Sequence, residues 1–191
     1  MTLFNNKYQT DSNRLKNWDY SSEAIYFITM VTQNREWLFG AINDHKMELN
    51  PNGKIIEKEL LRSIKIRENW FFHNWVIMPN HIHLLIEIKN DNPNTVETHC
   101  SASLHCTSLQ LESESQLSKL FRKPNSISSF VAILKSVTTQ KINLLTADSS
   151  KIWQSNYHDH IVRNHDSFDK ICHYIKNNPK NWNTDSINSI L

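Results

Sequence analysis

Glycine is almost absent from this chain of 191 residues, which contains only two. A loop that cradles phosphates needs glycines so that its backbone approaches the ligand closely, so a nucleotide-binding loop is excluded. Cysteine is also scarce, and the three cysteines form an odd number without the spacing of a disulfide framework. No stretch approaches the ~18 apolar residues of a membrane span, and the chain opens without the apolar run of a signal peptide. These absences predict a reduced, cytoplasmic protein with no membrane partner.

Neither sign of charge is in large excess, but the charges are distributed unevenly. The chain has 21 Lys and Arg against 19 Asp and Glu. Residues 90–118 carry four acidic and no basic side chains, whereas residues 119–180 carry ten Lys or Arg and four Asp or Glu. A basic region of this kind is typical of a surface that faces a polyanion, and a solvated basic face without a partner is the alternative.

The stretch PNHIHLLIEI at residues 79–88 is the most informative part of the sequence. It predicts a turn followed by a strand on which every second residue from Ile82 to Ile88 is apolar, while His81 and His83 share the opposite face. Positions two apart on a strand are separated by ~6.5–7 Å, so two imidazoles can converge on one metal ion. The pattern predicts a metal site, and a pair of surface histidines is the alternative.

Several other segments have regular patterns. The predicted elements are strands over residues 26–32 and 71–78 and helices over residues 54–68 and 126–145. The tight connection at Pro79 and Asn80 predicts that residues 71–78 pair antiparallel with the histidine strand. Residues 90–126 are rich in Ser, Thr, Asn and Gln and are interpreted as a polar, mobile insertion. Its two His-Cys pairs, at residues 99–100 and 105–106, fit no zinc-finger spacing.

The first 24 residues interleave basic and aromatic side chains, namely Arg14, Lys16, Trp18 and Tyr20. Such a mixture is typical of a flexible arm that holds single-stranded nucleic acid. An ordinary polar tail is the alternative. We interpret residues 1–24 as an arm that precedes one domain over residues 25–191.

The end of the chain predicts an amphipathic helix that stops before Pro179. Its apolar residues follow the i, i+3, i+4, i+7 rule, and they are Phe168, Ile171, Cys172 and Ile175. Asp166 is the expected N-cap. Tyr174 and Asn178 are four apart and therefore share one face; a core-edge tyrosine with a capping asparagine is the alternative. A second His-x-His, His158 and His160, has Asp159 between its histidines and hence no apolar backing.

Together these motifs resemble the REP-associated tyrosine transposases, the single-tyrosine branch of the HUH single-strand nucleases. The resemblance rests on the histidine strand and on the motifs WQ (153–154), HIVR (160–163) and YIKNNP (174–179) with Trp182. Near the start it rests on RLK (14–16), DYS (19–21), YF (26–27), TQNR (32–35) and LFG (38–40). It covers residues 14–89 and 127–182.

The resemblance implies an α/β (α+β) domain of the ferredoxin-like kind. In it, helices pack on an antiparallel sheet, the HUH motif lies on a central strand, and the catalytic tyrosine lies on a C-terminal helix. It implies that His81, His83 and Asn178 hold Mg²⁺ or Mn²⁺ and that Tyr174 is the nucleophile that forms a 5′-phosphotyrosine link.

The implied substrate is single-stranded or hairpin DNA with REP-like palindromes, which the enzyme cleaves and can rejoin. Lys135, Gln154 and Arg163 are expected to contact this DNA together with the N-terminal arm. The protein is expected to be a monomer or homodimer associated with the nucleoid.

Two alternatives stay open. One is a non-catalytic binder that stacks single strands on aromatic side chains of a ferredoxin-like sheet. The other is a metal-dependent nuclease that keeps the histidine pair but attacks with water, so that Tyr174 is dispensable.

Overall fold

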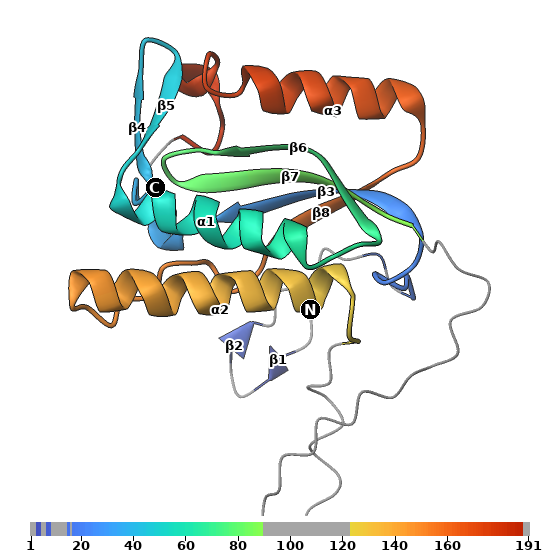
Figure 1. The fold of residues 1–191 in the computed structure, drawn as a ribbon, viewed down its shortest axis with the longest axis horizontal. Coiled ribbons are helices and arrows are strands. Elements are labelled where there is room, and N and C mark those ends of the chain that lie inside the picture. The colour runs from blue at the N-terminus through green and yellow to red at the C-terminus, as the bar shows by residue number, and fades with distance from the viewer. Residues whose placement is uncertain (1–2, 5–6, 9–14, 16, 90–122, 189–191) are drawn as a thin grey trace, which may run out of the picture.

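The computed structural model describes residues 3–4, 7–8, 15, 17–89 and 123–188. Its main sheet has four strands in the order β6-β7-β3-β8, and each neighbouring pair is antiparallel. These strands are β3 (Ala24–Val31), β6 (Trp70–Ile77), β7 (His81–Ile88) and β8 (His158–Val162). Two small hairpins lie outside this sheet (Figure 1): β1 (Leu3–Phe4) with β2 (Lys7–Tyr8), and β4 (Gly40–Asn43) with β5 (Lys46–Leu49).

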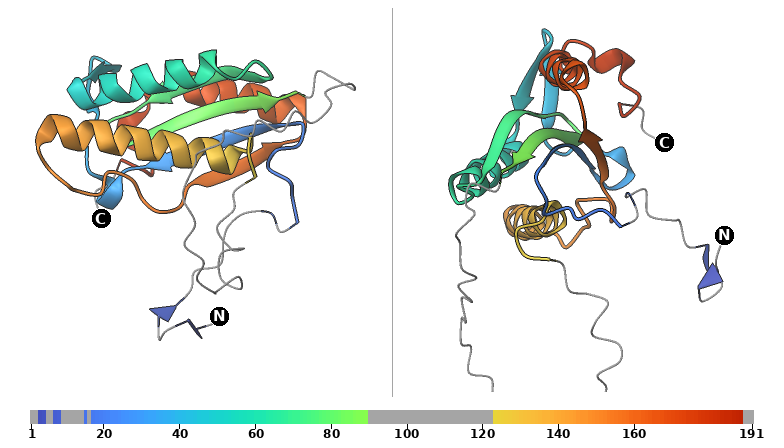
Figure 2. Two further views of the ribbon diagram at one scale, coloured as in Figure 1. Left: turned by 60° about the horizontal axis from the view of Figure 1, so that its bottom comes forward. Right: turned by 90° about the vertical axis from the view of Figure 1, so that its right-hand side faces the viewer.

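Three helices cover the two faces of the sheet. They are α1 (Pro51–Lys65), α2 (Ile127–Thr146) and α3 (His165–Asn177), with short 3₁₀ turns η1 (Gln33–Arg35) and η3 (Trp182–Thr184). Figure 2 shows α1 and α2 on one face and α3 on the other. The order strand, helix, strand, strand, helix, strand from β3 to β8 is the ferredoxin-like arrangement, which confirms the predicted fold. Within the described residues, no helix is both long enough and apolar enough to cross a membrane.

Side-chain caps define where the helices begin. The carboxamide oxygen of Asn50 accepts from the backbone N–H of Gly53 at the start of α1. Ser126 and Ser129 form a reciprocal capping box at the start of α2. At α3 the cap is Asn164, whose side chain accepts from the N–H of Ser167. The expectation that Asp166 is the N-cap is therefore wrong; Asp166 lies in the first turn, where its charge complements the helix dipole.

Two separate apolar cores result from this layering. The main core lies between the sheet and helices α1 and α2, and includes Ile82, Leu84 and Ile86 on the apolar face of β7. A smaller core between the sheet and α3 contains Leu85, Val162 and Ile175 as its buried members. The alternation predicted for β7 is thus confirmed, and both faces of this strand are covered.

Two side chains of the predicted arm, Trp18 and Tyr20, pack against the domain. Tyr20 is only 9% exposed and belongs to the main core, where its hydroxyl donates to Asp159 Oδ2 over 2.7 Å. Trp18 packs against the same core, and its indole N–H donates to the hydroxyl of Tyr26. These two side chains are therefore structural and cannot stack on DNA as the arm hypothesis expects. Arg14 and Lys16 lie outside the described residues.

Gly53 allows α1 to pack closely against the chain that leads to the histidine strand. A Cβ atom at Gly53 would lie 2.2 Å from the carbonyl oxygen of Phe39 and 2.8 Å from a methyl group of Leu49. The N–H of Phe39 in turn donates to the carbonyl of Pro79, just before the two histidines of β7 begin. The missing side chain therefore helps to position the turn at Pro79.

We expect Gly53→Ala to lower the free energy of unfolding by more than ~1 kcal/mol, although alanine favours a helix, because backbone atoms of Phe39 have no room to move away. Urea unfolding followed by circular dichroism measures the effect. The exposed Lys58→Ala on the same helix is the control and should change stability by less than ~0.5 kcal/mol. A neutral or stabilising Gly53→Ala would contradict the close approach.

Candidate functional site

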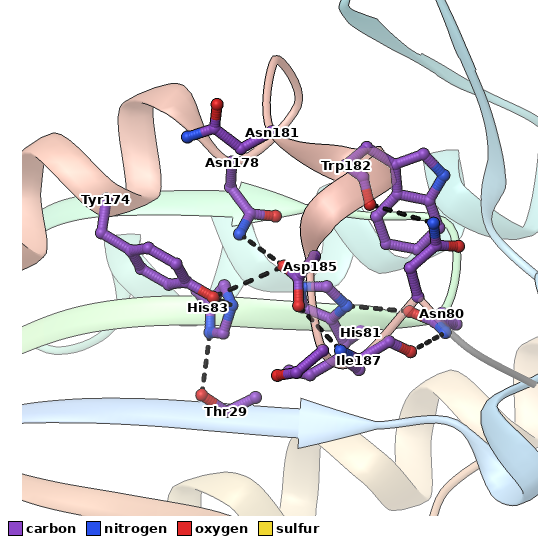
Figure 3. Close-up of polar contacts among 12 residues, drawn as sticks. Thr29, Asn80, His81, His83, Tyr174, Asn178, Asn181, Trp182, Asp185 and Ile187 are labelled. Carbon is purple, nitrogen blue, oxygen red and sulfur yellow. Dashed lines mark hydrogen bonds and ion pairs between the residues drawn. The ribbon is translucent and has the colours of Figure 1, made fainter. Parts of the chain in front are cut away.

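His81 and His83 lie side by side on β7 beneath the C-terminal part of α3 (Figure 3). Their rings have centroids 4.5 Å apart, and the residues are 0% and 2% exposed. The turn before them is held by backbone hydrogen bonds, because the N–H of Thr32 donates to Asn80 O and the N–H of Met78 donates to His81 O. The predicted convergence of the two imidazoles is confirmed, whereas a pair of surface histidines is excluded by their burial.

The Nδ1 atom of each histidine has its own partner. His81 Nδ1 lies 2.8 Å from Asn80 Oδ1, and the amide nitrogen of Asn80 donates to the carbonyls of Arg35 and Ile187. Because this amide nitrogen is used as a donor, Asn80 Oδ1 must accept, so His81 carries its proton on Nδ1 and presents a lone pair on Nε2. His83 Nδ1 lies 2.8 Å from the hydroxyl of Thr29.

Burial keeps both histidines uncharged at neutral pH. It lowers the pKa of His81 to about 4, although the carboxylate of Asp185 acts in the opposite direction. Burial and the neighbouring His81 lower the pKa of His83 well below its usual range. Neutral imidazoles are the form that binds a metal ion.

Tyr174 extends from α3 towards the histidine pair. Its hydroxyl lies 3.2 Å from His83 Nε2 and 3.4 Å from Asp185 Oδ2. Its ring meets the ring of Phe27 edge to face, with centroids 6.2 Å apart, and the residue is 39% exposed. Burial and the Asp185 carboxylate raise the pKa of Tyr174 to about 12. The phenol is thus held in place, accessible and protonated.

Asp185, just after η3, is a site residue that the sequence did not reveal. Its carboxylate accepts from the amide of Asn178 at 2.9 Å and lies 4.0 Å from His81 Nε2. Ligand atoms of His81, His83 and Asp185 all lie within 4.8 Å of one another. Asp185 follows Pro179 in a segment without periodicity, and only the nearby Trp182 of the family motif pointed to that region.

The residues present fit a divalent cation. His81 Nε2 and Asn178 Oδ1 are both buried and have no hydrogen-bond partner among the described residues. Both atoms are acceptors, because the proton of His81 is on Nδ1 and the amide nitrogen of Asn178 donates to Asp185. Together with the Asp185 carboxylate they form a set of nitrogen and oxygen donors that suits Mg²⁺ or Mn²⁺, and a cation would satisfy all of them.

The other residues expected to contact DNA lie elsewhere. The ammonium of Lys135 donates to the carbonyls of Gln154 and Asn156 at 2.8 Å, so it holds this loop against α2. The N–H of Gln154 donates to Val31 O, which ties the loop to β3. Arg163 is exposed at the end of β8. The polar insertion and its His-Cys pairs are outside the described residues, apart from residues 123–126.

Comparison with known proteins gives a relative and a fold. No family model matches the chain. An uncharacterised protein from Haemophilus influenzae is 34% identical over 181 residues, which cover 92% of this chain and 91% of that protein. A REP-associated tyrosine transposase solved with a REP hairpin has a TM-score of 0.55 at 16% identity, over 90% of this chain and 73% of that chain. A crystal structure of a candidate transposase from Deinococcus radiodurans gives a TM-score of 0.41 at 16% identity, over 86% of this chain and 96% of that chain.

We expect the metal-free protein to lose stability as the pH falls from about 6.5 towards 4, because the unfolded chain then protonates its histidines while buried His81 stays neutral. The contribution of His81 over this window is ~3 kcal/mol. Urea unfolding in excess chelator at several pH values measures it. His81→Gln should make the slope shallower by this share, while His83, whose pKa burial also lowers, keeps the rest; His45→Asn, in a surface turn, should keep the full slope. Equal pH dependence in all three proteins would contradict the assignment.

Proposed function

This chain belongs to one family with the Haemophilus influenzae protein and has the fold of a REP-associated tyrosine transposase, and we propose that it is a metal-dependent endonuclease and strand transferase acting on single-stranded DNA. The observation that carries the proposal is the hydroxyl of Tyr174, 3.2 Å from His83 Nε2 beside a cluster that suits a divalent ion. The proposed substrate is a DNA hairpin of the REP type, because the structural relative was solved with one.

Tyr174 is the proposed nucleophile. Its oxygen attacks the scissile phosphorus as the bond to the 3′ oxygen breaks, which leaves a 5′-phosphotyrosyl link and a free 3′ hydroxyl. Asp185 Oδ2, 3.4 Å away, is the carboxylate nearest to the phenol proton and can accept it, and the departing 3′ oxygen takes up a proton from water. Because the phosphodiester energy is kept in the link, the reverse attack by a 3′ hydroxyl rejoins strands without a nucleotide cofactor.

The proposed ligands of the ion are His81, His83, Asn178 and Asp185. When bound, a divalent cation supplies positive charge that polarises the phosphate and stabilises a phenolate. This is what the free site lacks, since the pKa of Tyr174 is raised to about 12 there. Holding the phenol on a helix next to the ligands orients it for attack at little entropic cost.

The position of Tyr174 favours this mechanism over the two alternatives. A nuclease that uses water has no need of a phenol held against a metal ligand, as Figure 3 shows for Tyr174 and His83. A non-catalytic binder has no need of two buried, uncharged histidines, one with its Nε2 atom 4.0 Å from the Asp185 carboxylate and the other with its Nε2 atom 3.2 Å from the Tyr174 hydroxyl. We propose further that the protein works at the nucleoid, as a monomer or homodimer.

The first test concerns the tyrosine. Tyr174→Phe removes one oxygen and keeps the ring against Phe27, so folding and DNA binding should persist. Covalent protein–DNA adducts and strand cleavage should fall by at least ~10³-fold, because no other nucleophile occupies this position. A denaturing gel after incubation with hairpin DNA and Mn²⁺ measures both. Tyr157→Phe, which removes a hydroxyl bonded to Ser128 near α2, is the matched control and should stay active. Undiminished cleavage by Tyr174→Phe would establish the water-dependent mechanism instead.

The second test concerns the ion. His81→Ala and His83→Ala should each abolish cleavage and weaken Mn²⁺ binding by ~10-fold or more, because each removes a ligand atom. Asn178→Ala should have a smaller effect, since a neutral amide oxygen is the weakest of the ligands. Mn²⁺ titration followed by electron paramagnetic resonance measures binding without DNA, and His45→Asn is the control. Full activity in excess chelator would refute a metal-dependent reaction.

A further inference from the structure

The second His-x-His motif lies on the same face of the sheet as the first. In the register of β3 with β8, Thr29 is opposite His158 and Phe27 is opposite His160. In the register of β3 with β7, Thr29 is opposite His83. Since residues opposite each other in a sheet project from the same face, His83, Thr29 and His158 form one row across three strands. His158 and His160 therefore lie on the α3 side of the sheet, level with the candidate site.

This part of the sheet is open. β8 is an edge strand next to β3. On the same face, α3 packs on β6 and β7, which lie towards the opposite edge of the sheet (Figure 1). His158 and His160 are exposed. Neither side chain forms a hydrogen bond or ion pair with another residue that the structure describes. Their imidazoles are thus free to meet a ligand.

The opposite face of β8 fixes this orientation. Asp159 accepts the hydroxyl of Tyr20 at 2.7 Å, and Ile161 packs against the main core. A shift of β8 by one residue would break this hydrogen bond and bury a histidine. The sequence expectation that Asp159 leaves the motif without backing is therefore wrong, because the backing is a hydrogen bond to a core tyrosine together with Ile161.

Aromatic rings connect this open face to the candidate site. Phe27 stacks on His83 with centroids 5.2 Å apart and an interplanar angle of 28°, and its neighbour across the strand pair is His160. Just after β8, Arg163 is exposed. It lines two hollows at the start of α3, with volumes of about 400 Å³ and about 370 Å³, and His160 also lines the larger one. An exposed aromatic ring next to an arginine is the combination that binds single-stranded nucleic acid, by base stacking and phosphate contact.

We propose that the open face of β3 and β8 is a binding subsite for the single strand that continues from the scissile phosphate. His160 stacks on a base of this strand, His158 contacts it on the same row as His83, and Arg163 binds its phosphate. The proposal rests on the proposed function, because it assumes a DNA strand at Tyr174.

The test measures DNA binding without cleavage. In the Tyr174→Phe background with excess chelator, fluorescence anisotropy compares a blunt DNA hairpin with the same hairpin carrying an oligo(dT) extension on its 5′ or 3′ side. We expect one extension to tighten binding by about ten-fold, the effect of ~1.4 kcal/mol of base stacking. His158→Thr combined with His160→Thr should remove this gain and leave the affinity for the blunt hairpin unchanged. Threonine keeps the preference of the edge strand for β structure.

A second variant separates stacking from a structural role. His160→Phe keeps a flat ring and should preserve most of the gain, whereas Arg163→Gln should reduce it and weaken its dependence on salt. Thermal unfolding checks each protein; if the double variant does not fold, His160→Thr alone provides the same comparison.

The single strand could instead leave the site past Trp37. This side chain is 49% exposed, and its ring contacts the ring of Trp182, which lies beside His81. If Trp37→Ala removes the gain while the histidine variants keep it, or if no extension tightens binding, the proposal is overturned. Adduct formation by proteins with Tyr174 intact is scored separately. If adducts form but the extension does not tighten binding, only the subsite proposal is refuted. If the extension tightens binding but no adducts form, only the proposal that Tyr174 is the nucleophile is refuted.

Discussion

The site depends on one constraint, which is that two uncharged imidazoles stay buried side by side on a single strand. The other face of β7 supplies Ile82, Leu84 and Ile86 to the main core. A slip of one residue would place isoleucines where the histidines are and histidines in the core, so the core itself fixes the register of the ligands. Because burial holds the pKa of both histidines below neutrality, the same packing also sets their charge.

Asn80 extends this constraint beyond the strand. Its amide joins His81 to the carbonyls of Arg35, the last residue of η1, and of Ile187, near the end of the described chain. The orientation of one imidazole thus depends on three segments that are far apart in the sequence. Outer partners of this kind orient a ligand and set its basicity, so they matter as much as the ligand itself.

Local patterns predicted much of this arrangement, and long-range contacts account for what they missed. Strand alternation placed His81 and His83 together, and helical spacing placed Tyr174 and Asn178 on one face, but only the family resemblance placed that face above the histidines. Asp185 was missed because its role depends on how the chain folds back after α3, which no periodicity records. Trp18 and Tyr20 look like an arm in sequence, yet the hydroxyl of Tyr20 has a partner on β8 that lies 139 residues away. The hairpin of β4 and β5 could not be recognised in the sequence either. Its turn contains two non-glycine residues with positive φ, Asp44 and His45, where glycine would have been the usual indication of a turn.

The division of the interior into two cores has a consequence for the motions of the protein. The nucleophile candidate is carried by α3, whose apolar side chains pack in the smaller core, where Leu85, Val162 and Ile175 are the fully buried members among the described residues. The histidines belong to a strand that is anchored in the larger one. Local opening costs least where few apolar side chains are buried, so we expect the amides of α3 to exchange with solvent faster than those of β7. The two halves of the site therefore differ in rigidity, so that a displacement of the helix would move Tyr174 and Asn178 while His81 and His83 stay in place.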